Sequence, residues 1–216
     1  MKTFYKAKFP HIHPIGSTFF ITFRLEGSIP RTELKTMKTT YLHKLDNLIK
    51  ITDTKSRNQK IFDLRKRYLS KYDELMHNID TGPTYMKSTK IMDIIKGQLH
   101  RFDGQLYDLI CYSIMSNHVH MLIDTKIQLE DIPLEYKLYD NNTQVSDIMK
   151  RIKGASARYS NKELGKTGSF WCKESYDMFI RNEIMLKKVI GYILENPVKA
   201  GIVVKWEDYD GNFLMS

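Results

Sequence analysis

Two histidines separated by one residue, His118 and His120, are of a type and spacing that could hold a metal ion. They follow Asn117, a residue that tolerates the backbone conformations of tight hairpin turns. Because side chains alternate between the faces of a strand, the imidazoles are expected on one face, about 7 Å apart along the strand, with Val119 and Met121 facing the core. Two imidazoles so placed can converge on one divalent ion. An ordinary pair of hydrogen-bonded histidines on a half-buried strand is the alternative.

The elements that must position these histidines are strands. Residues 106–115 are expected to form a strand that pairs, through a tight Ser-Asn turn, with a second strand beginning at His118. Residues 17–25 are rich in β-forming side chains and predict an earlier strand. An antiparallel hairpin is a stiff support for a metal site.

The remaining chain is expected to be mostly helical. In order, we expect an irregular lead-in over 1–16, charged helices within 31–79 that are separated by the polar stretch 52–58, a turn at 80–83, a helix over 88–104, a polar connection over 124–142, a helix over 143–165, an extended segment over 169–182, a helix from 182 to 196, and a polar tail after 206. In the helix over 143–165, apolar residues at helical spacing form one buried stripe: Val145, Ile148, Met149 and Ile152.

Composition narrows the class of protein. The chain has 216 residues, 42% of them hydrophobic, which is enough for one domain with a real core. Lys and Arg number 34 against 25 Asp and Glu, a net charge of +9 that favours an anionic partner such as nucleic acid. Two cysteines are too few for a disulfide framework. Neither a membrane span of ~20 apolar residues nor an apolar signal core is visible. We therefore expect a soluble cytoplasmic protein without membrane partners.

Five blocks of sequence, in this order, carry a resemblance to a known family. They are Thr22-Phe23-Arg24-Leu25, Met115-Ser116-Asn117-His118-Val119-His120, residues 165–171 (Gly-Lys-Thr-Gly-Ser-Phe-Trp), Glu174-Ser175-Tyr176-Asp177 with Arg181, and residues 192–201 (Tyr-Ile-Leu-Glu-Asn-Pro-Val-Lys-Ala-Gly). With these blocks the chain resembles the REP-associated tyrosine transposases, single-domain relatives of the IS200/IS605-type transposases.

The resemblance implies a fold and an activity. The fold would be α+β and ferredoxin-like, an antiparallel sheet with helices packed on it, forming a single domain over 1–216 with a core of about 17–204 and a helical insertion of about 31–103. The activity would be cleavage and rejoining of single-stranded, hairpin-containing DNA through a covalent 5′-phosphotyrosine. A divalent metal, Mg²⁺ or Mn²⁺, would polarise the phosphate oxygens.

The resemblance also implies site residues. His118 and His120 would be metal ligands, and Glu163 could complete the metal shell. Relatives carry the nucleophilic tyrosine at positions where this chain has Ala155 and Ser156. Tyr159 is the tyrosine in that helix, one turn after Ala155, and is the expected nucleophile.

The partner implied is single-stranded or hairpin DNA, bound by a monomer in preference to a homodimer. Basic residues would grip phosphates, and aromatic residues among them would stack on bases, although the same aromatics suit an ordinary core. The expected DNA contacts are Arg24, Lys150, Arg151, Lys153, Arg158, Lys162, Trp171, Lys173, Tyr176 and Arg181. Two alternatives are a catalytically silent protein that binds structured DNA and a metal-dependent phosphoesterase that uses water.

Overall fold

The computed structural model describes residues 4–6, 10–12, 16–78, 82–129 and 145–216. The chain forms two compact units. Unit 1 combines Met1–Leu25 with Thr84–Ser216, and unit 2 is Glu26–Pro83. The inserted unit is therefore shorter than the expected 31–103, because the helix over 89–100 belongs to unit 1.

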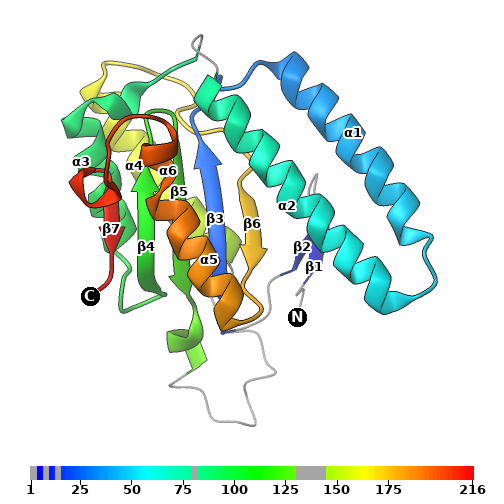
Figure 1. Cartoon of the computed structure of the whole chain (residues 1–216). Helices are drawn as coiled ribbons and strands as arrows, with labels where there is room; N and C mark the ends of the chain where they lie inside the picture. Colours follow the sequence, from blue (N-terminus) through cyan, green and yellow to red (C-terminus); the bar gives the residue numbers. More distant parts are fainter. Residues whose placement is uncertain (1–3, 7–9, 13–15, 79–81, 130–144) are drawn as a thin grey trace. The chain divides into compact units, whose positions relative to one another are not determined.

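Unit 1 is built on a five-stranded antiparallel sheet with the strand order β6-β3-β5-β4-β7 (Figure 1). Its strands are β3 (Thr18–Arg24), β4 (Asp108–Ile114), β5 (His118–Asp124), β6 (Tyr176–Phe179) and β7 (Asn212–Leu214). The expected hairpin is the pair β4 and β5. The last strand, β7, lies where only a polar tail is expected, and it covers the outer edge of β4.

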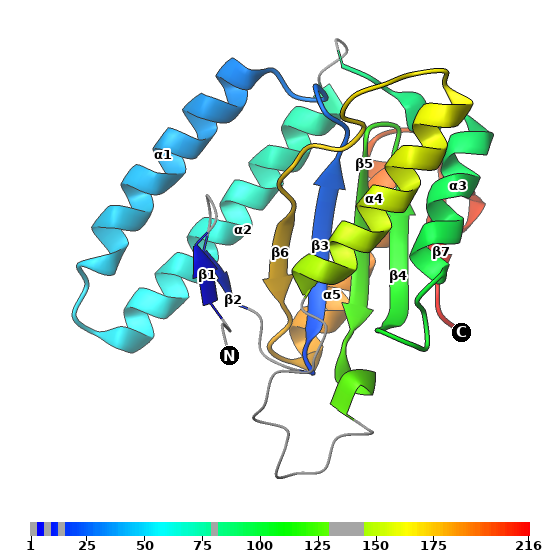
Figure 2. The same ribbon diagram turned by 180° about the vertical axis from the view of Figure 1, so that it is seen from behind.

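Helices cover both faces of this sheet. α3 (Thr89–His100) and α4 (Val145–Glu163) lie on one face (Figure 2). α5 (Glu183–Leu194) and its continuation α6 (Asn196–Lys199) lie on the other (Figure 1). The order β6-β3-β5-β4, with both crossover helices α3 and α4 on one face, is the ferredoxin-like arrangement. The expected α+β class is confirmed.

The core of unit 1 lies between the sheet and the helices α3 and α4. Alternation along the strands turns the odd-numbered side chains of β3 and β5 toward these helices. The buried cluster includes Phe19, Ile21, Phe23, Val119, Met121 and Ile123 from the strands, Ile91, Ile95 and Leu99 from α3, and Val145, Ile148 and Ile152 from α4. The apolar stripe of α4 is thus buried against the apolar face of β5. The even-numbered side chains of β5, the histidines among them, point to the face that carries α5.

Unit 2 contains two helices, α1 (Arg31–Ile49) and α2 (Thr54–Asn78). The break between them comes slightly earlier than expected, because the Asp53 carboxylate accepts a hydrogen bond from the Ser56 N–H at 2.8 Å, as a helix N-cap does. Aromatic rings join the helices: Tyr41 and Tyr68 have centroids 4.7 Å apart.

Smaller elements complete the described chain. β1 (Phe4–Lys6) and β2 (Pro10–Ile12) pair as a separate two-stranded sheet, so the lead-in is more regular than expected. Single 3₁₀ turns are η1 (Tyr85–Lys87), η2 (Lys126–Leu129) and η4 (Trp206–Asp208). Most of the expected polar connection, the start of the following helix at 143–144, and residues 80–81 of the expected turn lie outside the described residues. Among the helices described, none has both the length and the apolar character needed to cross a membrane.

Candidate metal and nucleic-acid site

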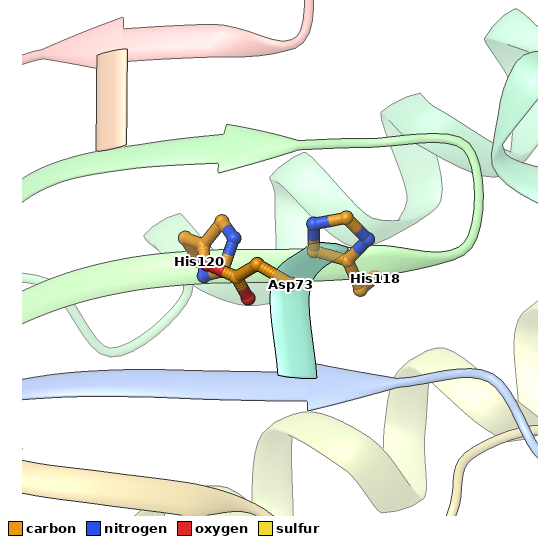
Figure 3. A group of neighbouring side chains, drawn as sticks. All are labelled: Asp73, His118 and His120. Carbon is orange, nitrogen blue, oxygen red and sulfur yellow. The ribbon is translucent and has the colours of Figure 1, made fainter. Parts of the chain in front are cut away.

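The two histidines lie side by side on β5. Their rings project from the same side of the strand (Figure 3), with centroids 4.7 Å apart and planes at 75°. Both side chains are buried. Val119, between them, enters the core on the opposite face, so the alternation expected from the sequence is what the strand adopts. Asp73, also labelled in Figure 3, belongs to α2 in unit 2. The histidines belong to unit 1.

Hydrogen bonds hold both rings through Nδ1. The Nδ1 of His118 donates to Asn117 Oδ1 at 2.6 Å, and the Nδ1 of His120 lies 2.7 Å from Thr22 Oγ1. Since Asn117 Oδ1 can only accept, the His118 ring carries a hydrogen on Nδ1, which leaves Nε2 as the nitrogen available to a metal. Such a partner on the second nitrogen fixes ring orientation and raises ligand basicity. The donor set therefore fits a divalent ion bound through the two Nε2 atoms.

Tyr192 of α5 lies against this pair. Its ring meets the His120 ring at a centroid distance of 5.6 Å with planes at 65°, and it meets Phe20 edge-on at 5.9 Å. Phe20 in turn stacks on His120 at 5.7 Å. The Tyr192 hydroxyl is buried and has no hydrogen-bond partner among the described residues. The Nζ of Lys199 lies 4.8 Å from the Tyr192 ring centroid, which brings a positive charge beside the phenol.

The helix that carries Tyr192 has a defined start and direction. Asn182 caps it, accepting a hydrogen bond from the Met185 N–H at 2.9 Å. The helix runs opposite to β5, and α6 continues it (Figure 1). Asn196 follows Tyr192 by one turn, is 1% exposed, and lies toward the end of β5 that begins with His118.

Arg24 and Tyr176 are the expected DNA contacts that the fold brings to this face. Arg24 lies directly opposite His118 in the β3–β5 ladder, is 4% exposed, and donates to the Leu25 carbonyl at 3.2 Å. Tyr176 and His120 both lie opposite Thr22, on either side of it, in one cross-strand row. The sheet thus places a guanidinium and a second phenol beside the imidazoles.

Tyr159, the expected nucleophile, lies elsewhere. It belongs to α4, which packs on the opposite face of the sheet (Figure 2). Its side chain is 38% exposed, its hydroxyl accepts a hydrogen bond from Arg158 at 2.8 Å, and the guanidinium lies over its ring. The structure does not bring Tyr159 to the histidines. The physical reason is that α4 must bury its apolar stripe on the apolar face of β5, which is the face the histidines do not share.

The same placement separates Glu163 and the basic residues of α4 from the imidazoles. Glu163 forms an ion pair with Lys90 at 3.2 Å, between α4 and α3. Four basic residues are exposed on this helix: Lys150, Arg151, Arg158 and Lys162. Their contacts to DNA stay a prediction, and any such contact lies on the α3–α4 side of the sheet.

Two further expected DNA contacts have structural partners instead. Trp171 is 6% exposed, donates from Nε1 to Ser156 Oγ at 2.9 Å, and packs edge-on against Phe23 at 4.8 Å. The indole is therefore part of the core, a placement that does not favour the base stacking expected from the sequence. The ammonium group of Lys153 is also bonded within the protein, because its Nζ donates to the Cys172 carbonyl at 2.7 Å.

Lys153 ties α4 to the segment before β6. Its Nζ also donates to the Lys173 carbonyl and to Ser175 Oγ, both at 3.1 Å. Burial, with a smaller contribution from Arg24, lowers the pKa of Lys153 to about 8 against the opposing effects of Cys172 and Glu174. Lys173 and Arg181 are exposed at either end of the β6 region, with Arg181 over the Phe179 ring.

Comparison with known proteins adds a structural relative. No protein-family model matches the chain, and no curated protein matches it in sequence. Among solved structures, the fold is similar to that of a REP-associated tyrosine transposase bound to a REP hairpin. The TM-score is 0.52 with 12% sequence identity, covering 96% of this chain and 82% of the other. At that identity the likeness supports the fold alone.

The sequence does not predict a site role for several residues of this face: Thr22, Asn117, Tyr192, Asn196 and Lys199. All of them stand in the blocks of resemblance. A usable signal was present, since the stripe of α4 and the histidines need opposite faces of β5. That requirement excludes the tyrosine of α4 from the histidine face, but it does not say which other helix covers that face.

Proposed function

We propose that the protein is a metal-dependent DNA strand transferase in which Tyr192 is the nucleophile and His118 and His120 hold the metal. The observation that carries this proposal is the contact between the Tyr192 and His120 rings, 5.6 Å between centroids. The likeness in fold to a hairpin-bound tyrosine transposase supports DNA as the substrate. Asn196, one turn after Tyr192, is a further candidate ligand through its amide oxygen.

The reaction assigned to these residues is a transesterification. The Tyr192 oxygen forms a bond to phosphorus, the bond from phosphorus to the 3′-oxygen breaks, and the departing oxygen takes up a proton to become a 3′-hydroxyl. The phenolic proton is lost to solvent. The product is a 5′-phosphotyrosine, whose ester bond a second 3′-hydroxyl can displace to rejoin DNA. A divalent ion, when bound, polarises the non-bridging phosphate oxygens.

The protein's own charges support this chemistry. A phenol with an ordinary pKa near 10 is a reluctant nucleophile at neutral pH, so positive charge close to it helps. Lys199 supplies such a charge over the Tyr192 ring. Arg24, opposite His118, is placed to stabilise the negative charge that the phosphate accumulates.

A covalent-adduct assay tests the proposal. A single strand that contains a hairpin is labelled at its 3′ end, because the fragment held through a 5′-phosphotyrosine retains that end. The DNA is mixed with protein and Mn²⁺ and run on a denaturing protein gel. We expect a labelled adduct with the wild-type protein and with Tyr159→Phe, and none with Tyr192→Phe.

Other outcomes select other functions. An adduct that survives Tyr192→Phe and disappears with Tyr159→Phe would return the nucleophile to Tyr159. Cleaved DNA without any adduct would indicate a phosphoesterase that uses water. Salt-sensitive binding without metal-dependent cleavage would indicate a catalytically silent DNA-binding protein. A monomer, Mg²⁺ or Mn²⁺ as the metal, and a cytoplasmic location belong to this proposal as well.

A further inference from the structure

Residues 206–214, the clamp segment, contact the helix that carries Tyr192. The Nδ2 of Asn212 donates to the Leu194 carbonyl at 2.9 Å and to the Trp206 carbonyl at 3.0 Å. Leu194 is the last residue of α5, two residues after Tyr192. The side-chain amide of Asn212, at the start of β7, therefore joins the end of α5 to Trp206, where the turn before β7 begins.

The same segment also contacts the strand that leads to the histidines. The Ile114 N–H donates to the Gly211 carbonyl at 2.8 Å, and the Tyr209 hydroxyl donates to the Ile114 carbonyl at 2.7 Å. Ile114 ends β4, and the turn after it closes with a hydrogen bond from the Met115 N–H to the His118 carbonyl at 2.8 Å. The clamp segment is thus bonded to both halves of the proposed catalytic site.

Register places Asn212 in line with His120. Ser113 of β4 has His120 opposite it on one side and Asn212 on the other, so the three side chains share the α5 face of the sheet. From this row Asn212 reaches α5. This row of three residues therefore begins at the metal-binding candidate His120 and ends at Asn212, the residue bonded to the end of α5.

Close approach at Gly211 shows how tightly the segment is seated. A Cβ at this position would lie 2.6 Å from the Ile114 oxygen and 2.5 Å from Tyr209 Cε1. Both distances are shorter than side chains tolerate, and the first is to backbone. Only glycine lets the segment lie against Ile114 in this way.

Contacts on the other face of the sheet hold the segment in place. Lys96 of α3 forms an ion pair with Asp210 at 2.8 Å. The Phe213 ring stacks on Tyr112 at 5.2 Å and meets His100 edge-on at 4.6 Å. The segment is therefore anchored to α3, to β4 and to α5.

We propose that the clamp segment sets the position of the Tyr192 phenol against the imidazoles, with Asn212 as the positioning residue. The proposal rests on the proposed function for its catalytic consequence, and on the hydrogen bonds above for its mechanical one. It predicts that loss of the Asn212 amide leaves His118, His120 and Arg24 in place but lets the end of α5 shift. A misplacement of this kind slows the chemical step without weakening binding.

The test compares Asn212→Ala with Asp208→Asn, a control in an exposed residue of the same segment. Single-turnover adduct formation, DNA affinity and Mn²⁺ affinity are measured for each. For Asn212→Ala we expect a rate lower by about 10- to 100-fold with both affinities unchanged, and for the control a wild-type rate. An unchanged rate in Asn212→Ala, or an equal fall in DNA affinity, would overturn the proposal.

Gly211→Ala provides a second variant, because it displaces the segment while keeping the Asn212 amide. We expect the same separation, a slower rate at unchanged DNA affinity. Partial unfolding would instead lower the rate and the affinity together, which the paired measurements distinguish.

Hydrogen–deuterium exchange separates this proposal from the proposed function. In Asn212→Ala we expect amides over 190–200 to exchange about tenfold faster, the effect of one lost hydrogen bond, while those of α3 are unchanged. If the wild-type protein forms no adduct, the proposed function fails, and faster exchange still supports the link to α5. Unchanged exchange over 190–200 would remove that link and the proposal with it.

Discussion

The ring of Tyr192 lies edge-on to the ring of His120, 5.6 Å between centroids, although the two residues are 72 positions apart in the sequence. This contact joins the last helix to the histidine strand. The Tyr192 hydroxyl has no hydrogen-bond partner in the described part of the chain. Burial of a hydroxyl without a partner costs free energy, so the packing of the ring, and not the hydroxyl, stabilises this contact.

Replacing Tyr192 by Phe should therefore separate stability from activity. The ring contacts with His120 and Phe20 survive, and we expect the free energy of unfolding to stay within about 1 kcal/mol of the wild type. Adduct formation should be lost. Urea unfolding and the adduct assay on one preparation check this, and a large loss of stability would show that the hydroxyl has a structural role.

Removing the partners of Nδ1 should weaken metal binding. Asn117→Ala and Thr22→Val each leave an imidazole without its orienting hydrogen bond, and we expect Mn²⁺ affinity to fall about 10- to 100-fold. Calorimetric titration with Mn²⁺ measures the affinity. Thr18→Val is the matched control, since Thr18 lies on the same face of β3 but bonds Asp124. An equal loss in that control would indicate general damage to the sheet.

Trp171→Phe should lower stability and spare DNA binding. The change removes the hydrogen bond to Ser156 Oγ from a buried site, so we expect a loss of about 1–3 kcal/mol in the free energy of unfolding. The exposed neighbour Lys173, changed to Ala, should cost under about 0.5 kcal/mol. Weaker DNA binding by folded Trp171→Phe would restore the stacking role expected from the sequence.

Lys153 should make stability depend on pH above neutrality. Burial lowers its pKa to about 8 in the folded chain, against about 10.4 for an unfolded lysine. Between these values the unfolded chain binds more protons, so stability rises with pH across this window. Arg24, Cys172 and Glu174 are the charged or titratable groups that act on it.

The measurement compares wild type with Lys153→Met, which shares all other titrating groups. We expect wild type to gain on the order of 2 kcal/mol relative to this variant between about pH 8 and pH 10, with a constant difference below pH 8. A flat difference throughout would mean that the ammonium titrates like an exposed lysine.

Local pattern was enough to predict several features. The hairpin with His118 and His120 on one face follows from the two-residue period of a strand, which no distant contact can change without breaking the strand. The start of the last helix at residue 182 and the apolar stripe of α4 are likewise properties of neighbouring residues. The α+β class was implied by the resemblance of the sequence blocks to a transposase family.

Other features were decided by contacts between distant parts of the chain. Whether Tyr159 or Tyr192 meets the imidazoles depends on which helix covers which face of the sheet, and a helix pattern alone does not name its face. The boundary of unit 2 and the strand β7 depend on packing in the same way, since Asn212-Phe213-Leu214 is too short to signal a strand.

The sequence by itself determined that two imidazoles share one side of a strand, because strand geometry is local. Only the tertiary structure decided which phenol faces them. α4 buries its apolar stripe against Val119 and Met121 and so takes Tyr159 to the far face, while α5 covers the remaining face and brings Tyr192 to His120. Burial of apolar surface, summed over a whole helix, outweighs the placement of any single tyrosine.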